Sequence, residues 1–340
     1  MFSVVLIVRD EAQSLPAALA SLGAVPDLVV CDTGSVDDTP ALAKSLGARV
    51  VSFAWCDDFA AARSFAESHA RFDWIFRLDA DERFETEVPT RASLSEWLNP
   101  HLDAAERIGA GQVFMRRCHS GNDEHWFPRI HRRSLLIWKY PVHERVIPRD
   151  GAWPRSIAAD GARVRHERRE RPRPYRRILE RALAEAPADP YLVFHLGREC
   201  FLTGNILAAT LWLKTFLSGE PGYRFHRSEA EMLLGRCLAS TGDMAGAFSA
   251  LEQAAQQGPR AEPLWHAAQL ALRCRDFDRA QRYYQSGHTM TPPLEKQPFG
   301  QLAPPYVTDW NCYGTLAWSG IKETLDQQLV IRKSPQLQPT

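Results

Sequence analysis

A short acidic cluster, Asp79-Ala80-Asp81-Glu82, follows an apolar run that begins at Trp74. Carboxylates two residues apart on an extended segment point to the same side, so Asp79 and Asp81 should lie close together. Two like charges that close repel each other unless a cation or a network of donors neutralises them. A hard divalent cation such as Mg²⁺ or Mn²⁺ prefers oxygen ligands and could also hold a diphosphate. The alternative is a charged turn at the end of a buried strand.

A second polar segment runs from Asp32 to Thr39 and follows another apolar run. Gly34 permits a tight turn, and the hydroxyl and backbone N–H groups around it can donate hydrogen bonds. The Asp32 carboxylate at a strand end suits the imide N–H of a uracil or a ribose hydroxyl. The alternative is an Asx-turn followed by a helix that Thr39 caps.

Two more charged segments stand at the ends of expected elements. Arg9-Asp10-Glu11 follows the first apolar run, where it either lines the same crevice or forms a polar loop. Arg63 lies one turn inside a helix that begins near residue 59 and is capped by Asp57 or Asp58. From there it can reach a diphosphate, or it can pair with Asp58 or Glu67 on the helix surface.

The residues between these segments predict a scaffold that brings them together. Apolar runs at 3–8, 28–31, 49–53 and 74–78 alternate with helix-forming stretches. This order predicts a parallel sheet with right-handed crossovers, and such sheets bind ligands at the carboxyl ends of their strands. We expect further strands, antiparallel and at the edge of the sheet. They are expected at 112–118, 126–131 and 135–140.

From about residue 175 the pattern changes to helices with an internal repeat. Small residues recur at fixed offsets, with steps of 38 and 33 residues between copies, close to the ~34-residue tetratricopeptide period. Small residues let paired helices approach closely, and a proline ends each unit because it cannot continue the second helix. Generic helical hairpins are the alternative. The copies are Leu196-Gly197, Ala209 and Pro221; Leu234-Gly235, Ala247 and Pro259; and Ala268, Ala280 and Pro292.

The bulk composition is that of a globular protein. The chain has 340 residues, enough for two domains, and its formal net charge of zero implies no general attraction to polyanions or membranes. None of the seven cysteines forms a C-x-x-C pair, and no apolar stretch approaches the ~18–20 residues of a spanning helix. The apolar N-terminus lacks the basic residues of a signal peptide. We therefore expect a cytoplasmic protein with buried free thiols.

Arginines crowd the stretch between the two expected domains. On a helix that begins near Pro174, Arg176, Arg177 and Arg181 with Glu180 are typical of a solvated face. The alternative is a surface that binds an anionic molecule, such as a phosphorylated lipopolysaccharide core or nucleic acid bearing a hydroxymethylated base. The arginines of this stretch are Arg163, Arg165, Arg168, Arg169, Arg171, Arg173, Arg176, Arg177 and Arg181.

Taken in order, four segments resemble the pattern of glycosyltransferase family 2. The similar subgroup carries tetratricopeptide repeats after a compact catalytic domain, and it includes lipopolysaccharide-core glucosyltransferases and S-glycosyltransferases that act on peptide cysteine. The resemblance covers residues 1 to about 290. Its segments are Val5-Leu6-Ile7-Val8-Arg9-Asp10-Glu11, Asp32-Thr33-Gly34-Ser35-Val36-Asp37-Asp38-Thr39, Phe53-Ala54-Trp55-Cys56-Asp57-Asp58-Phe59-Ala60-Ala61-Ala62-Arg63 and Trp74-Ile75-Phe76-Arg77-Leu78-Asp79-Ala80-Asp81-Glu82.

The resemblance implies an α/β catalytic domain of GT-A fold, a Rossmann-like mixed sheet, over residues 1–170. An all-α tetratricopeptide-like repeat domain would cover 171–295 and a C-terminal extension 296–340. The implied activity is metal-dependent, inverting transfer of a sugar from a nucleoside-diphosphate sugar, most often a UDP-linked hexose, to a hydroxyl or thiol. The acceptor is left open between a glycan such as lipopolysaccharide core, a peptide and a modified nucleic-acid base, and so is the oligomeric state.

The resemblance also assigns roles in the donor site. Asp32 would contact the base, Asp79 the ribose or the metal, and Asp81 would ligate Mn²⁺ or Mg²⁺ as a catalytic residue. The implied donor-binding residues are Val8, Arg9, Glu11, Asp32, Gly34, Ser35, Asp37, Arg63, Asp79 and Ala80.

On the acceptor side, Pro141-Val142-His143-Glu144 resembles the family's Val-His-Glu segment. Glu144 is the candidate base for the acceptor proton, and His143 the candidate third metal ligand. Alternatively, Glu144 pairs with Arg145 or Arg132 on a surface loop. His166 falls in a match to a later family segment and is a further site candidate.

The chain departs from the family at two positions of the donor pocket. Asp10 and Ser64 stand where the family usually has Asn. A competing function is a non-catalytic scaffold, with a degenerate transferase domain and peptide-binding repeats. The intact Asp79-Ala80-Asp81 favours the enzyme over this scaffold.

Overall fold

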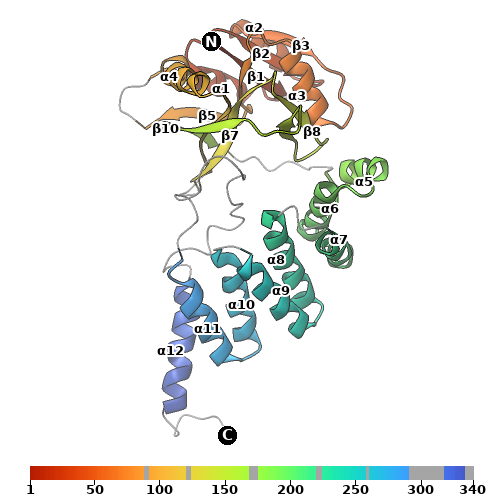
Figure 1. The fold of residues 1–340 in the computed structure, drawn as a ribbon, viewed down its shortest axis with the longest axis vertical. Coiled ribbons are helices and arrows are strands. Elements are labelled where there is room, and N and C mark those ends of the chain that lie inside the picture. Colours follow the sequence, from red (N-terminus) through yellow and green to blue (C-terminus); the bar gives the residue numbers. More distant parts are fainter. Residues whose placement is uncertain are drawn as a thin grey trace. The chain divides into compact units, whose positions relative to one another are not determined.

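The structure is a computed structural model that describes residues 1–87, 92–119, 124–167, 175–219, 224–257, 260–290 and 318–333. The chain divides into two compact units, one within Met1–Ile178 and the other beginning at Leu179 (Figure 1). Among the described residues, none of the helices has the length and apolar character needed to cross a bilayer.

The first unit is built on a mixed eight-stranded sheet with the strand order β3-β2-β1-β4-β7-β6-β10-β5. The first four strands in this order are parallel, whereas β7 runs antiparallel to both of its neighbours, as β5 does to β10. The strands are β1 (Phe2–Val8), β2 (Leu28–Asp32), β3 (Arg49–Ser52), β4 (Trp74–Arg77), β5 (Glu82–Thr86), β6 (Ala110–His119), β7 (Glu124–Arg132), β8 (Leu136–Lys139), β9 (Arg145–Pro148) and β10 (Arg155–His166).

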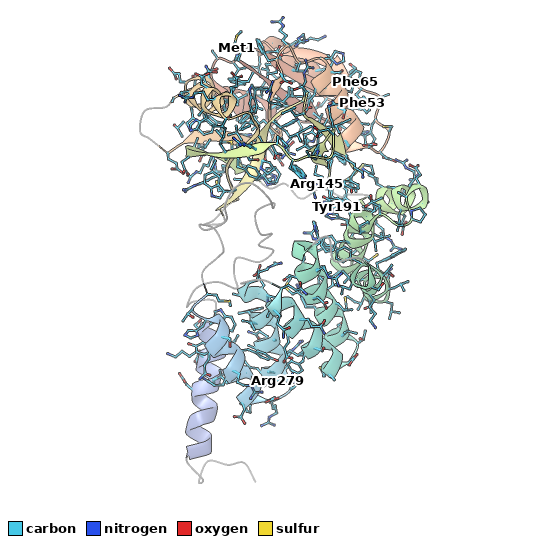
Figure 2. All side chains as sticks on the ribbon, viewed as in Figure 1. Met1, Phe53, Phe65, Arg145, Tyr191 and Arg279 are labelled. Carbon is cyan, nitrogen blue, oxygen red and sulfur yellow. The ribbon has the colours of Figure 1, made fainter. Side chains whose placement is uncertain are left out.

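Helices cover both faces of this sheet because its central strands are apolar on both sides. Alternate residues of β1 and β4 pack with α1 (Leu15–Leu22) and α4 (Leu94–Arg107) in one core, which also takes in Ala43 of α2 (Thr39–Ser45). The residues between them pack on the other face with α3 (Phe59–Ser68). There the rings of Phe53 and Phe65, labelled in Figure 2, lie 5.2 Å apart between centroids.

The four parallel strands confirm the sequence prediction, but the expected edge position of the later strands was wrong. β7 lies inside the sheet because it hydrogen-bonds to β4 on one side and β6 on the other. β8 leaves the sheet and pairs with β9 in a separate hairpin, where its Leu136 and Trp138 pack on Ala60 of α3. Strands β5, β9 and β10 were not predicted, since charged residues interrupt the alternation that marks a strand.

The second unit consists of helices that pair in sequence order (Figure 1). The sequence repeat is confirmed, because its small residues lie where paired helices cross: a Cβ on Gly235 would stand 2.7 Å from Leu251 Cγ, and Ala209, Ala247 and Ala280 are fully buried. The three prolines of the repeat lie outside the described residues. The helices are α5 (Tyr175–Glu185), α6 (Pro190–Leu202), α7 (Ile206–Ser218), α8 (Arg224–Ser240), α9 (Met244–Gln256), α10 (Ala261–Arg273), α11 (Phe277–Gly287) and α12 (Ser319–Lys333).

Side chains also tie the repeats of this unit together. Arg279 of α11, labelled in Figure 2, lies 3.8 Å from the ring centroid of Phe248 on α9 and donates a 2.8 Å hydrogen bond to Glu252. Trp318 at the start of α12 is fully buried and lies against Gly287. The apolar core therefore runs through to the C-terminal helix.

Candidate active site

The loops after β1 and β2 are joined to each other by hydrogen bonds. The backbone N–H of Asp10 donates to Ser35 Oγ at 2.9 Å, and the N–H of Val36 donates to Asp10 Oδ1 at 2.8 Å. Asp10 has a φ of +55°, in the left-handed region that Asn and Asp tolerate better than most residues. Asp therefore serves the turn at a position where the family usually has Asn.

A second set of bonds joins the same two loops further along. Thr39 Oγ1 accepts a 2.8 Å hydrogen bond from the N–H of Glu11, and it also bonds to Asp37. Asp37 in turn accepts from the N–H of Ala12 at 3.1 Å. The prediction that Thr39 caps α2 was wrong: Thr39 is the first helical residue and Asp38 the cap, without a side-chain bond. The hydroxyl of Thr39 holds the loop after β1 instead.

Asp32 lies at the end of β2 with an exposed fraction of only 7%. Its carboxylate accepts from the backbone N–H groups of Gly34 and Ser35, both at 3.2 Å, which is the Asx-turn that the sequence allowed. Gly34 has a φ of +103°, which only glycine adopts readily. The structure thus places Asp32, Gly34, Ser35 and Asp37 in one hydrogen-bonded loop beside the end of β1.

The remaining predicted donor residues differ in exposure. The carbonyl of Val8 accepts from both the N–H and the hydroxyl of Thr33, which closes the end of β1 onto β2. Arg9 is exposed, and Glu11 bonds to the Ser14 hydroxyl. Ala80 is buried, and its carbonyl accepts from Arg83.

Arg63 joins the end of β4 to the segment before β9. Its Nε donates to Glu144 Oε1 at 2.7 Å, and its terminal NH2 donates to Asp79 Oδ1 at 3.0 Å. Arg63 is therefore held by neither Asp58 nor Glu67: Asp58 caps α3, and Glu67 accepts from Trp138. The suggested pairing of Glu144 with Arg132 is also not observed, since Arg132 binds Asp73.

The charges around Arg63 reinforce one another. Burial by itself would lower the pKa of Arg63, but Asp79 and Glu144 outweigh it and raise that pKa above its usual range. For Asp79, burial alone would raise the pKa, yet nearby arginines, with Arg63 first, hold it well below the usual range. Both groups are therefore ionised at neutral pH, and 31% of the Asp79 side chain stays exposed.

Glu82, the last acid of the cluster, has a structural role that the sequence did not reveal. It is fully buried, and Arg129 donates hydrogen bonds to both of its carboxylate oxygens, at 2.7 and 2.9 Å. Arg117 adds a contact at 3.1 Å. Glu82 Oε2 also accepts from the backbone N–H of Asp79 at 3.0 Å, so it fixes the turn that presents Asp79.

The histidine in contact with Asp81 is His166 and not the predicted His143. The Nε2 of His166 lies 3.2 Å from Asp81 Oδ2, and both side chains are partly exposed. Sheet pairing produces this contact, because β10 and β5 place His166 opposite Glu82. His143, with a φ of +55°, has its ring 5.4 Å from that of Tyr175. Within the described residues, no three or more His, Cys, Asp and Glu side chains form a ready-made metal cluster.

The arginine-rich stretch divides between two elements. Arg163 and Arg165 of β10 both pair with Glu85 on β5. Arg176, Arg177 and Arg181 are exposed on α5, as the solvated-face interpretation predicts. The remaining arginines of the stretch, Arg168, Arg169, Arg171 and Arg173, lie outside the described residues.

Comparison with known proteins gives a family match that coincides with the first unit. Residues 3–168 match the model described as Glycosyl transferase family 2. The chain is 34% identical over 277 residues to a TPR repeat-containing protein of Synechococcus elongatus, covering 75% of this chain and 66% of that protein. That share is larger than the family 2 segment, so the likeness extends beyond residue 168.

Other likenesses are shorter or more distant. An uncharacterized glycosyltransferase of Rickettsia felis is 38% identical over 87 residues, covering 25% of this chain and 30% of that protein. The chain thus spans just under two thirds and under one third, respectively, of the curated relatives it matches.

Two solved structures have a TM-score below 0.5, and they carry no assignment. S. aureus TarS residues 1–349 in complex with UDP is 12% identical, covers 84% of this chain and 90% of that chain, and has a TM-score of 0.41. Glucosyl-3-phosphoglycerate synthase from Mycobacterium tuberculosis with Mn²⁺, UDP and phosphoglyceric acid is 19% identical, covers 54% and 78%, and scores 0.36.

Proposed function

Because residues 3–168 match the model of glycosyl transferase family 2, we propose that the chain is a metal-dependent, inverting glycosyltransferase. Its donor is a nucleoside-diphosphate sugar, and a UDP-linked hexose is the first to test. Its acceptor supplies a hydroxyl or thiol. The observation that carries the proposal is the buried Arg63, which joins Asp79 of the acidic cluster to Glu144, the candidate base.

The donor nucleotide is assigned to the joined loops after β1 and β2. Parallel strands β2, β1 and β4 lie side by side, so their carboxyl ends share one edge of the sheet. The loops at that edge are already fixed by hydrogen bonds, including those of Asp32 and Ser35. A rigid loop loses little conformational entropy on binding, which favours affinity for the base and ribose.

The side chains at the end of β4 fit a divalent cation that is completed by substrate. The 3.2 Å between Asp81 Oδ2 and His166 Nε2 is short enough for both atoms to hold one divalent cation. Mg²⁺ and Mn²⁺ sites of this kind often use few protein ligands and take the rest from phosphates and water. We propose Asp81 and His166 as ligands, with Asp79 as a further candidate and His143 as the alternative histidine. When bound, the cation would neutralise the negative charge of the departing diphosphate.

The remaining chemistry falls to Glu144. The acceptor oxygen or sulfur attacks the anomeric carbon while the bond from that carbon to the diphosphate oxygen breaks, which inverts the configuration. The acceptor proton passes to a carboxylate oxygen of Glu144, and the nucleoside diphosphate leaves. Arg63 positions Glu144 through the 2.7 Å bond to its Oε1, which leaves the other oxygen for the acceptor.

The test is Asp81→Ala, assayed as release of nucleoside diphosphate from a panel of nucleotide sugars. We expect a fall in kcat of at least about 100-fold, or about 2.7 kcal/mol, because one ligand of the cation is lost. Asp103→Ala is the matched control, since Asp103 is exposed on α4. Sugar transfer by Asp81→Ala at the wild-type rate, with an unchanged melting temperature, would refute the assignment.

The scaffold alternative is tested by ligand binding. A ligand that binds only the native state raises the melting temperature. No shift with millimolar UDP and Mn²⁺ would favour a degenerate domain. A panel of lipid-linked glycan, peptide thiol and modified DNA then identifies the acceptor.

A further inference from the structure

Arg77 is a buried cation beside the candidate active site. It is the last residue of β4 and stands two residues before Asp79 in the chain. Its exposed fraction is 8%. The guanidinium carbon lies 4.8 Å from the ring centroid of Phe127 and 5.2 Å from that of Trp138, so two aromatic rings flank it.

No carboxylate of the described residues is paired with Arg77. Its Nε is fully buried and has no hydrogen-bond partner in the part of the chain that the structure describes. The nearest acids are held by other arginines: Asp79 by Arg63, and Glu82 by Arg129. A buried charge without a partner costs free energy, and removing water from it makes it a strong binder of an anion.

Other arginines near Arg77 are each paired with a carboxylate. Four arginines, including Arg77, lie at the end of β4, and three carboxylates hold the other three. Among these four arginines, Arg77 alone has no ion pair with a carboxylate of the described residues, so its guanidinium is available to a ligand. The arginines are Arg63, Arg77, Arg117 and Arg129, and the carboxylates are Asp79, Glu82 and Glu144.

We propose that Arg77 binds an anionic group, a phosphate or carboxylate, of the acceptor substrate. The acceptor assignment rests on the proposed function and on the side of the site where Arg77 lies. The guanidinium carbons of Arg77 and Arg63 each lie 5.2 Å from the ring centroid of Trp138. Arg63 in turn donates a hydrogen bond to Glu144, the candidate base. The candidate cation ligands Asp81 and His166 instead contact each other where the start of β5 lies beside the end of β10. Arginine suits this role because its planar fork matches the oxygens of phosphates and carboxylates.

The first test measures anion binding without activity. Inorganic phosphate is titrated into the metal-free, full-length protein while the melting temperature is followed. We expect a rise of several degrees for wild type at millimolar phosphate, and no rise for Arg77→Met. Arg132→Met is the control, because Arg132 pairs with Asp73 at the other end of β4. It should keep the rise. Arg77→Gln serves as a second variant if Arg77→Met does not fold.

The same titration on protein saturated with UDP and Mn²⁺ distinguishes the source of the anion. A phosphate shift that persists supports an acceptor group, whereas a shift abolished by UDP assigns Arg77 to the donor diphosphate and overturns the proposal. Absence of the shift in wild type, or an equal shift in Arg77→Met, also overturns it. If UDP and Mn²⁺ themselves cause no shift, the proposed function fails, and the acceptor assignment falls with it even where phosphate binding is measured.

Discussion

At the scale of single residues, the acidic side chains of one short cluster take different roles. Asp79 and Glu82 are both acids of the same turn, but Glu82 is fully buried between Arg129 and Arg117 and holds the Asp79 backbone. Asp79 keeps almost a third of its side chain exposed. Only the more exposed acids of the cluster are therefore available to a ligand.

The choice between two histidines can be decided at this scale. We predict that His166→Ala weakens the apparent affinity for Mn²⁺, measured with UDP present, at least about tenfold, because His166 contacts Asp81. His143→Ala is the matched change, and it should leave Mn²⁺ affinity within about twofold. The opposite order would return His143 to the metal site and remove His166 from it.

At the scale of elements, the amino ends of the strands are joined as firmly as their carboxyl ends. Asp27, just before β2, accepts from the Ser3 hydroxyl of β1 at 2.7 Å, from Arg49 of β3 at 2.7 Å and from the N–H of Arg71 at 2.9 Å. One buried carboxylate thus connects three neighbouring strands of the sheet and the chain that leads into β4.

This connection predicts a pH dependence of stability. Burial would raise the pKa of Asp27, but its hydrogen bonds with Arg71, Ser3 and Arg49 outweigh burial and lower it. A folded-state pKa below the unfolded value of about 3.9 gives stability that is present at neutral pH and lost as the pH falls through the folded-state pKa. The Asp27→Asn variant should be less stable than wild type at pH 7. Its free energy of unfolding should also fall less than that of wild type between about pH 5 and 2. Urea unfolding across that range measures this, and parallel curves for the two proteins would contradict it.

Pairing of helices in the repeats predicts a steric effect. A Cβ at Gly235 would lie 2.7 Å from Leu251 Cγ and 3.0 Å from the backbone oxygen of Ala247. We therefore expect Gly235→Ala to destabilise the helical unit by about 1–3 kcal/mol, because α8 and α9 must move apart. Gly320→Ala is the control, since nothing lies within 4 Å of its Cβ position. Chemical denaturation followed by circular dichroism compares them, and equal stability would show that the helices adjust freely.

At the scale of the whole molecule, each unit has its own apolar core. One core surrounds β1 and β4, and the other is built from α8 to α12. Chains with separate cores need not unfold in one step. The candidate active site lies within the first unit, so its ligands should stabilise that unit directly.

Calorimetry of the full chain tests this division. We predict two unfolding transitions, one for each unit. UDP with Mn²⁺ should increase the free energy of unfolding of the first unit by about 2.7 kcal/mol when free ligand is 100 times its Kd. Gly235→Ala should lower only the other transition. A single transition that responds to both changes would show that the two units unfold together.

The sequence by itself determined the parallel strands, the repeated helix pairs and the segments that we propose to carry the chemistry. These are local features: runs of apolar residues, caps such as Asp58, and small residues at fixed offsets encode them over a few residues. The acidic cluster and the Asp32 loop were found because strand ends in such a sheet are where polar residues meet.

Only the tertiary structure decided which of these residues touch. Arg63 and Glu144 are 81 positions apart, and Asp81 and His166 are 85 apart, so no periodic pattern links them. The register of β10 against β5 brings His166 to Asp81. Glu144 lies between β8 and β9, the two strands of the hairpin that leaves the sheet, and it reaches Arg63 there. Strand order likewise decides which arginines bind Glu82, and it leaves Arg77 without an ion pair to a carboxylate of the described residues. Long-range pairing is set by how the whole chain buries its apolar surface, which a local pattern does not contain.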